Sequence, residues 1–189
     1  MARPEAIVIG CSAGGLDALK LLLRALDPTL PQAVIVCSHS GDQGSLLGEL
    51  LARHSPLPVR EAHERWPVQA GVVHLAPAGY HLLIERDRRF AYSVDEPVHY
   101  SRPSIDVLFE SAADAFGAGL IGVMLTGASA DGAYGLARIR AAGGLAVVQD
   151  PAEASAAAMP QAALDRAGAD HCLPLAQIAP LLNQLAHSE

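Results

Sequence analysis

The sequence predicts an α/β fold with a doubly wound, mainly parallel sheet that is flanked by helices and carries one antiparallel hairpin. Short apolar segments recur along the chain with helical patterns between several of them, which is typical of repeated strand-helix-strand units. The segments are nearly continuous in apolar residues, and strands of this kind belong to sheets that are buried on both faces. Because 51% of the residues are hydrophobic and only 4% are aromatic, we expect a core of Ala, Leu, Val and Ile.

Five strands are expected in the parallel sheet. Each is a short apolar run that is bounded by glycine or by polar residues. Their predicted ranges are Ala6–Ile9, Ala33–Cys37, Val72–Leu75, Leu120–Leu125 and Leu145–Val148.

Six helices are expected between and after these strands. The third has the clearest start, because Pro103 and Ser104 precede it and Asp106 lies in its first turn. The predicted ranges are Leu16–Ala25, Ser45–Arg53, Ile105–Phe116, Ala133–Ala142, Gln161–Ala167 and Leu175–Ala186.

A change of pattern between Val72 and Val94 predicts an antiparallel hairpin at one end of the sheet. The segments His81–Glu85 and Phe90–Val94 flank a charged turn, and we interpret its residues Arg86–Arg89 as a solvated tip. The chain contains no linker rich in Ser, Pro or charge and no internal repeat. We therefore expect residues 1–189 to form a single domain.

Charge and cysteine content exclude several classes of protein. The formal net charge is −7, so nucleic acid, which binds clustered Lys and Arg, is not an expected partner. The three cysteines, Cys11, Cys37 and Cys172, are odd in number and lack paired spacing, which favours reduced thiols in the cytoplasm. No apolar run reaches the length of a membrane span. We therefore expect a cytoplasmic protein without membrane insertion.

The glycine-rich segment Gly10–Gly15 directly follows the first predicted strand and precedes the first predicted helix. Its Gly10-x-Ser12-x-Gly14 pattern fits a nucleophile elbow, in which glycines allow a sharp turn that exposes the serine hydroxyl. The same turn also suits a phosphate group, since free N–H groups and the positive end of a helix dipole meet there. Ser12 is also placed to cap the helix. The turn alone therefore leaves these interpretations open.

Partners for Ser12 are expected at the carboxyl ends of other strands, where open parallel sheets form their ligand crevice. His39 follows the second predicted strand and is a candidate general base. Asp131 comes shortly after the fourth and is a candidate for the carboxylate that orients the imidazole. Asp131 is equally placed to cap the helix that begins near Ala133. Position does not decide between Asp131 and Asp150, which also follows a strand.

Other features argue against cofactor-binding alternatives. A dinucleotide fingerprint needs glycine at the position of Ser12 and an acidic residue where Ser38 and His39 stand. No P-loop sequence occurs, no Cys/His spacing suggests zinc, and the residues near the expected crevice do not predict a metal triad. Asp42 and Asp106 are further rival carboxylates. Cys11 is a second candidate nucleophile, but we expect it to pack inward as a small apolar residue.

Four segments together resemble the catalytic domain of the chemotaxis protein-glutamate methylesterases, the CheB family. They are Ile9–Gly15, the strand-terminal His39, Ser101–Phe109 and Leu125–Ala133. The resemblance extends from about Ala6 to the last helix. Their order Ser, His, Asp differs from the order in α/β-hydrolases, Ser, Asp, His.

This resemblance implies hydrolysis of glutamyl methyl esters, and often deamidation of glutamine, on the cytoplasmic helical domain of methylated chemoreceptors. By the same resemblance Ser12 is the nucleophile, His39 the general base and Asp131 the orienting carboxylate. The backbone N–H groups of Ala13 and Ala128 are the expected oxyanion donors. No cofactor or metal is implied.

The chain departs from the family pattern in three places along the expected crevice, which implies an altered substrate pocket. Ala13 replaces a hydroxyl residue, Ser40–Asp42 replaces Met-Pro-Pro, and Ala128–Ala130 replaces a loop that begins with Met-Gly. A receiver domain usually precedes the family's catalytic domain, whereas here the matching region begins within the first ten residues. We expect a stand-alone enzyme that is constitutively open or controlled by a separate receiver protein. The competing interpretations are a divergent serine esterase for another methyl ester or amide, and a binding module with a vestigial triad.

Overall fold

The computed structural model describes residues 4–39 and 44–187, and all structural statements below refer to these residues. A central seven-stranded sheet has the strand order β3-β4-β2-β1-β7-β8-β9, and every neighbouring pair is parallel. The strands are β1 (Ala6–Cys11), β2 (Ala33–Ser38), β3 (Val59–Glu61), β4 (Val73–Leu75), β7 (Leu120–Met124), β8 (Leu145–Gln149) and β9 (His171–Leu173).

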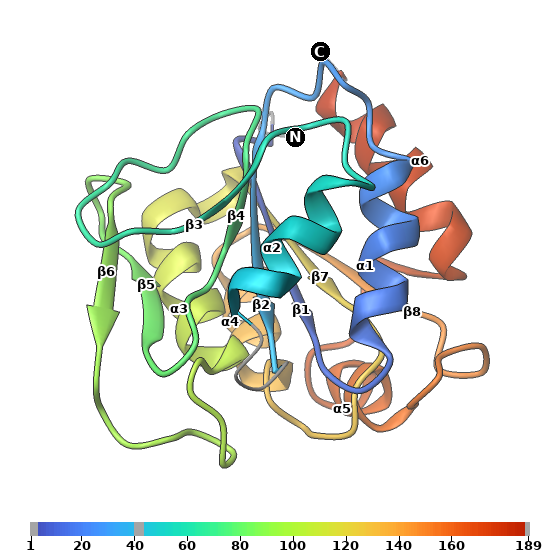
Figure 1. The fold of residues 1–189 in the computed structure, drawn as a ribbon. Coiled ribbons are helices and arrows are strands. Elements are labelled where there is room, and N and C mark those ends of the chain that lie inside the picture. Colours follow the sequence, from blue (N-terminus) through green and yellow to red (C-terminus); the bar gives the residue numbers. More distant parts are fainter. Residues whose placement is uncertain (1–3, 40–43, 188–189) are drawn as a thin grey trace.

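Helices cover both faces of this sheet (Figure 1). One face packs against α1 (Gly15–Arg24), α2 (Gly44–Ala52) and α6 (Leu175–Ala186). The other packs against α3 (Ile105–Phe116), α4 (Ala133–Ala141) and α5 (Ala158–Ala167), and a short 3₁₀ turn, Gly117–Gly119, follows α3. The predicted doubly wound α/β fold is therefore confirmed.

The hairpin consists of β5 (His81–Ile84) and β6 (Phe90–Ser93), which pair in antiparallel register. It forms a two-stranded sheet of its own instead of lying at one end of the central sheet, where we expected it. The reason is its apolar face: Leu82, Ile84 and Phe90 are buried in the same core as α3. The hairpin is thereby fixed to α3.

The chain direction determines where a site can form. Strand β1 lies in the middle of the sheet, with β2 on one side and β7 on the other. Because the strand order reverses at β1, a crevice is expected at the carboxyl ends of β1, β2 and β7. In Figure 1 these ends lie at the bottom, opposite both chain termini.

Candidate active site

The loop after β1 is a tight turn that ends at α1. Ser12 donates its backbone N–H to Thr126 O at 2.9 Å, and its carbonyl accepts the N–H of Gly15 at 2.8 Å. Gly14 is the N-cap of α1 with a left-handed φ of 77°, which favours glycine, and no side chain caps the helix. The alternative in which the Ser12 hydroxyl caps α1 is therefore wrong.

The register of the sheet brings Ser12 and His39 to the same level. Cys11 pairs with Ser38, and the N–H of His39 donates to Cys11 O at 3.2 Å. Neighbouring strands lie about 4.8 Å apart, so the residues that follow this pair are neighbours across the two strand ends. Within residues 4–39 and 44–187, no hydrogen bond joins the Ser12 hydroxyl to the His39 ring. The structure thus places the backbones of Ser12 and His39 side by side, without a hydrogen bond between their side chains.

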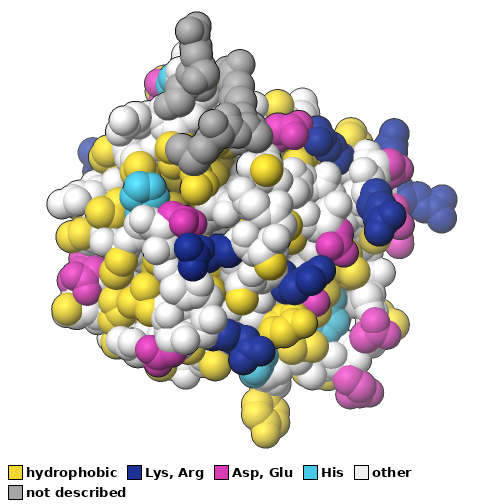
Figure 2. All heavy atoms as spheres, turned by 180° about the vertical axis from the view of Figure 1, so that it is seen from behind, with side chains coloured by type: hydrophobic (Ala, Val, Ile, Leu, Met, Phe, Trp, Pro, Cys, Tyr) yellow, Lys and Arg dark blue, Asp and Glu magenta, His cyan; other side chains and the backbone are white. Residues whose placement is uncertain are grey.

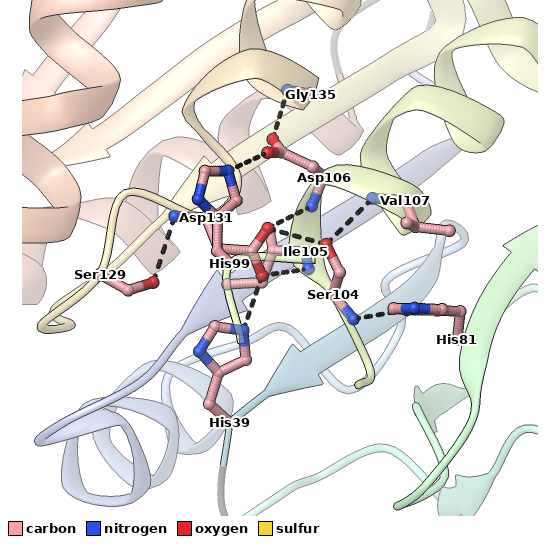
Figure 3. A network of polar contacts seen from close by, with 10 residues as sticks. All are labelled: His39, His81, His99, Ser104, Ile105, Asp106, Val107, Ser129, Asp131 and Gly135. Carbon is pink, nitrogen blue, oxygen red and sulfur yellow. Dashed lines mark hydrogen bonds and ion pairs between the residues drawn. The ribbon is translucent and has the colours of Figure 1, made fainter. Parts of the chain in front are cut away.

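His39 contacts Asp131 directly (Figure 3). His39 Nε2 lies 2.7 Å from Asp131 Oδ2, and the Asp131 side chain is completely buried. Three donors at the start of α3 hold the same carboxylate. Ser104 Oγ and the Asp106 N–H donate to Oδ1 at 2.8 and 3.0 Å, and the Ile105 N–H donates to Oδ2 at 2.7 Å. The first turn of α3 therefore orients the partner of His39.

Hydrogen bonding keeps Asp131 charged despite its burial. Burial alone raises the pKa of a carboxyl group, since a charge is costly in a low-dielectric interior. Here the hydrogen bonds from His39, from the N–H groups of Asp106 and Ile105 and from Ser104 outweigh that effect, and the pKa of Asp131 is lowered. A carboxylate ionised at neutral pH is the partner that a histidine needs when it takes up a proton.

The sequence of the chain matches the CheB methylesterase family model over residues 7–182. The chain belongs to the CheB methylesterase family. A relative from Leptospira interrogans is 45% identical over 184 residues, which cover 96% of this chain and 94% of the relative. Its name, given in provisional form, is protein-glutamate methylesterase/protein-glutamine glutaminase.

Two further comparisons agree with the CheB assignment. A protein-glutamate methylesterase/protein-glutamine glutaminase from Symbiobacterium thermophilum is 38% identical over 180 residues. This match covers 94% of the chain but only 49% of that relative, so the chain spans about half its length. The crystal structure of the Thermotoga maritima CheB methylesterase catalytic domain superimposes with a TM-score of 0.92 at 27% identity, covering 96% of this chain and 98% of that one.

Two backbone donors of this CheB-family chain are free beside Ser12. In the part of the chain that the structure describes, neither the Ala13 N–H nor the Ala128 N–H donates a hydrogen bond. The two loops lie in direct contact, since a Cβ atom on Gly127 would come within 2.9 Å of Ser12 Cβ. The loop that begins at Gly127 therefore lies against Ser12, and the role of the two N–H groups as oxyanion donors stays a prediction.

The rival carboxylates have other partners. The Asp150 side chain accepts the N–H of Ala152 at 2.9 Å in its own turn. Asp106 accepts the N–H of Gly135 at 2.7 Å, and its Oδ2 lies 3.2 Å from His99 Nε2. Asp42 and the segment Ser40–Asp42 lie outside the described residues. Among the carboxylates that the structure describes, Asp131 is the one in contact with His39.

Asp131 does not cap the helix that follows it. Gly132 is the N-cap of α4 with a left-handed φ of 95°, and no side chain caps that helix. The alternative in which Asp131 caps the helix near Ala133 is thus wrong. Its oxygens instead face the first N–H groups of α3, which is distant in sequence.

Cys11 is unsuited to act as the nucleophile. It is completely buried, and burial raises the pKa of its thiol to about 11, although a hydrogen bond with Ser38 opposes the shift. A thiol with this pKa carries almost no thiolate at neutral pH. The interpretation of Cys11 as a small inward-packing residue is confirmed.

A group with metal-ligand spacing occurs at the site, contrary to the expectation from sequence. His99, Asp106 and Asp131 each offer a ligand atom, and these atoms lie within 4.8 Å of one another. However, both Asp131 oxygens already accept two hydrogen bonds each, and Asp106 Oδ1 accepts the N–H of Gly135. N–H donors and the Ser104 hydroxyl thus take the carboxylate lone pairs that a cation needs, and these residues do not fit a metal site.

Sequence reasoning missed the polar residues that surround Asp131. The sequence pattern gives His81 no role beyond its place in the predicted hairpin, gives His99 no role at all, and indicates only a helix start at Ser104. Ser104 is indeed the N-cap of α3, accepting the Val107 N–H at 3.4 Å, yet its hydroxyl also donates to Asp131. The position of His81 at the start of a strand carries no signal for its contact with the Ser104 backbone.

A pocket of about 620 Å³ opens beside this network, between α3, α4 and α5. His99, Asp106, Ala130, Tyr134 and Arg166 are among its lining residues.

Figure 2, which shows the molecule from behind, has Lys and Arg side chains interspersed with Asp and Glu. No described helix is long and apolar enough to cross a membrane.

Proposed function

We propose that this chain hydrolyses glutamyl methyl esters on the cytoplasmic helical domain of methylated chemoreceptors. The observation that carries the proposal is the contact of His39 with the buried Asp131 at the strand ends where Ser12 stands, in a member of the CheB family. The three free cysteines suit a reducing compartment, and the proposal places the activity in the cytoplasm.

The contacts of His39 define its role in the proposed mechanism. Its Nε2 faces Asp131, so the neutral ring that donates Nε2–H to the carboxylate keeps a free lone pair on Nδ1. Nδ1 takes the proton of the Ser12 hydroxyl while Oγ attacks the ester carbonyl. The proton then passes to the departing methoxide, methanol leaves, and an acyl-enzyme remains. Water that gives its proton to His39 attacks the acyl-enzyme, and Ser12 recovers a proton as the glutamate is released.

The free N–H groups of Ala13 and Ala128 would bind the negative oxygen of the tetrahedral intermediates. Backbone donors do not depend on side-chain identity, so alanine at both positions is compatible with this role. The same acyl transfer with ammonia as leaving group would deamidate glutamine, and the names of the relatives, which include protein-glutamine glutaminase, support that second activity. Control by a separate receiver protein stays a prediction from the sequence.

The test is methanol release from methylated receptor cytoplasmic domains, with wild-type protein compared with Ser12→Ala. We expect the variant to lose hydrolysis while it keeps the wild-type circular dichroism spectrum and unfolding midpoint, because Ser12 is only partly buried. Retained hydrolysis in Ser12→Ala would exclude the serine as nucleophile.

A fluorophosphonate probe separates the competing functions. Labelling confined to Ser12 together with methanol release supports the receptor methylesterase. Labelling of Ser12 without release from any methylated receptor domain would favour an esterase for another substrate. Absence of labelling in the folded protein would favour a binding module.

A further inference from the structure

A continuous chain of hydrogen bonds links the β5–β6 hairpin to Asp131. His81, at the start of β5, is 1% exposed, and its Nδ1 accepts the backbone N–H of Ser104 at 3.1 Å. Ser104 is completely buried, and its hydroxyl donates to Asp131 Oδ1 at 2.8 Å. In Figure 3 the imidazole of His81 lies at the opposite side of Ser104 from the Asp131 carboxylate. The chain therefore runs from hairpin to helix start to carboxylate.

The donor and acceptor roles along this chain are fixed. A backbone N–H can only donate, so His81 Nδ1 carries no proton, and its Nε2–H donates to Glu96 O at 3.0 Å. The single hydroxyl proton of Ser104 is used on Asp131, because a carboxylate can only accept. Each group has one arrangement that satisfies its neighbours. Such a network orients the final acceptor more tightly than one hydrogen bond does.

We propose that Ser104 and His81 are positioning residues for the reaction, holding Asp131 Oδ2 toward His39. This inference rests on the proposed function, in which His39 is the general base. Oδ1 has two donors, Ser104 Oγ and the Asp106 N–H, and loss of the first leaves the carboxylate freer to turn. His81 acts one step further away, since it fixes the Ser104 backbone and thus the direction of its hydroxyl. Neither residue touches the reacting atoms.

The first variant is Ser104→Ala, and its matched control is Ser111→Ala. Ser111 also joins hairpin to helix, because its hydroxyl accepts the N–H of Ile84 at 3.0 Å and donates to Leu108 O at 3.0 Å. It makes no contact with Asp131 in the described part of the chain. We expect kcat of Ser104→Ala to fall about 10- to 100-fold with KM within about twofold, as for a lost hydrogen bond to a charged group. Ser111→Ala is expected to keep the wild-type kcat.

The second pair of variants, His81→Asn and His81→Gln, divides the two hydrogen bonds of the imidazole. The Asn amide oxygen takes the place of Nδ1 and keeps the acceptor for the Ser104 N–H. The longer Gln side chain places its amide near Nε2 and keeps the donor to Glu96 O. Both lose the buried ring, so both are expected to lose stability in urea unfolding. We expect kcat of His81→Gln to be about 10-fold below that of His81→Asn.

A readout that does not depend on activity separates this inference from the proposed function. The His39 Nε2–H that faces Asp131 gives a proton NMR signal whose position reports the hydrogen bond. We expect this signal to move upfield in Ser104→Ala and to keep its position in Ser111→Ala. An unchanged signal in Ser104→Ala would overturn the positioning role, even if wild-type protein released no methanol.

The kinetic results are equally decisive if wild-type protein releases methanol. Equal kcat in Ser104→Ala and Ser111→Ala would mean that the hairpin contacts are structural only. Equal losses of kcat in His81→Asn and His81→Gln would mean that His81 stabilises the fold without positioning Asp131.

Discussion

Asp131 is a buried carboxylate whose charge and direction are set by neighbours that all donate to it. Ser104, Ile105 and Asp106 supply three hydrogen bonds, and His39 supplies a fourth. Hydrogen bonds to a charged group stabilise more than neutral ones, and loss of the charge would leave these donors poorly matched. The role of Asp131 therefore depends on its being ionised.

We predict that Asp131→Asn lowers turnover by about 10⁴-fold, the loss found when a triad carboxylate is replaced by its amide. The amide NH₂ introduced by Asp131→Asn can only donate, so facing His39 it would favour the tautomer with the proton on Nδ1. The proposed mechanism needs the proton on Nε2. Asp150→Asn is the matched control and is expected to keep wild-type turnover, because Asp150 contacts the Ala152 N–H and not the His39 ring. Both are measured as methanol release. Loss of turnover in Asp150→Asn instead would contradict the assignment.

At this scale, sequence alone predicts candidate residues but not their pairing. Asp131 and Asp150 both follow a strand. What distinguishes Asp131 is that it accepts hydrogen bonds from the start of α3, which is more than 20 residues away in sequence. His81 and Ser104, which are also in contact, are 23 residues apart in the sequence. Such contacts arise from tertiary packing, which no local pattern encodes. The resemblance to a family favoured Asp131 where position could not.

Helices α3 and α4 approach each other closely at Gly135. A Cβ atom there would lie 2.5 Å from Phe109 Cβ and 3.1 Å from Asp106 O. The Gly135 N–H also donates to Asp106 Oδ1 at 2.7 Å. This contact sets the spacing of the two helices next to the first turn of α3, the turn that holds Asp131.

We predict that Gly135→Ala destabilises the fold by about 1–3 kcal/mol, the usual effect of overpacking, and also lowers turnover. Gly48→Ala in α2 is the control, because its nearest neighbour would be Leu75 Cδ1 at an ordinary 3.6 Å. Alanine favours a helix interior by roughly 0.5–1 kcal/mol, so this control is expected to be neutral or stabilising. Urea unfolding measures both. Equal stability of the two variants would contradict the close packing of α3 on α4.

Element prediction succeeded where periodicity was strong. All five predicted strands and all six predicted helices occur, with Ile105–Phe116 and Leu175–Ala186 matching in both bounds. Strands β3 and β9 were missed because each has three residues and neither is fully buried. Helix α5 begins at Ala158, before the predicted Gln161, since Pro160 fits within a first turn.

At the scale of the whole fold, residues 4–39 and 44–187 form two apolar cores, one on each face of the central sheet. Cys37 belongs to the core beneath α3 and α4, and Cys11 to the core beneath α1 and α6. Burial raises the pKa of Cys37 well above its usual value and that of Cys11 to about 11. Cys172 is exposed on β9. The reactivity of Cys37 and of Cys11 therefore measures how readily each core opens, and that of Cys172 serves as the surface reference.

We predict that a thiol-specific chromogenic reagent modifies one cysteine in the folded protein and all three after unfolding in urea. Cys172 is the expected rapid site because it alone of the three is exposed. Peptide mapping after a brief reaction identifies the labelled residue. Rapid modification of Cys11 or Cys37 in the native state would show that one core opens more readily than its burial implies.

The first turn of α3 has a consequence for the electrostatics of the site. The N–H groups at a helix start attract anions, and here the occupant is Asp131, a carboxylate of the same chain. A tethered occupant needs no binding from solution, so chloride or phosphate finds these donors already taken. The negative charge opposite His39 is thereby a permanent part of the fold, independent of the ions around it.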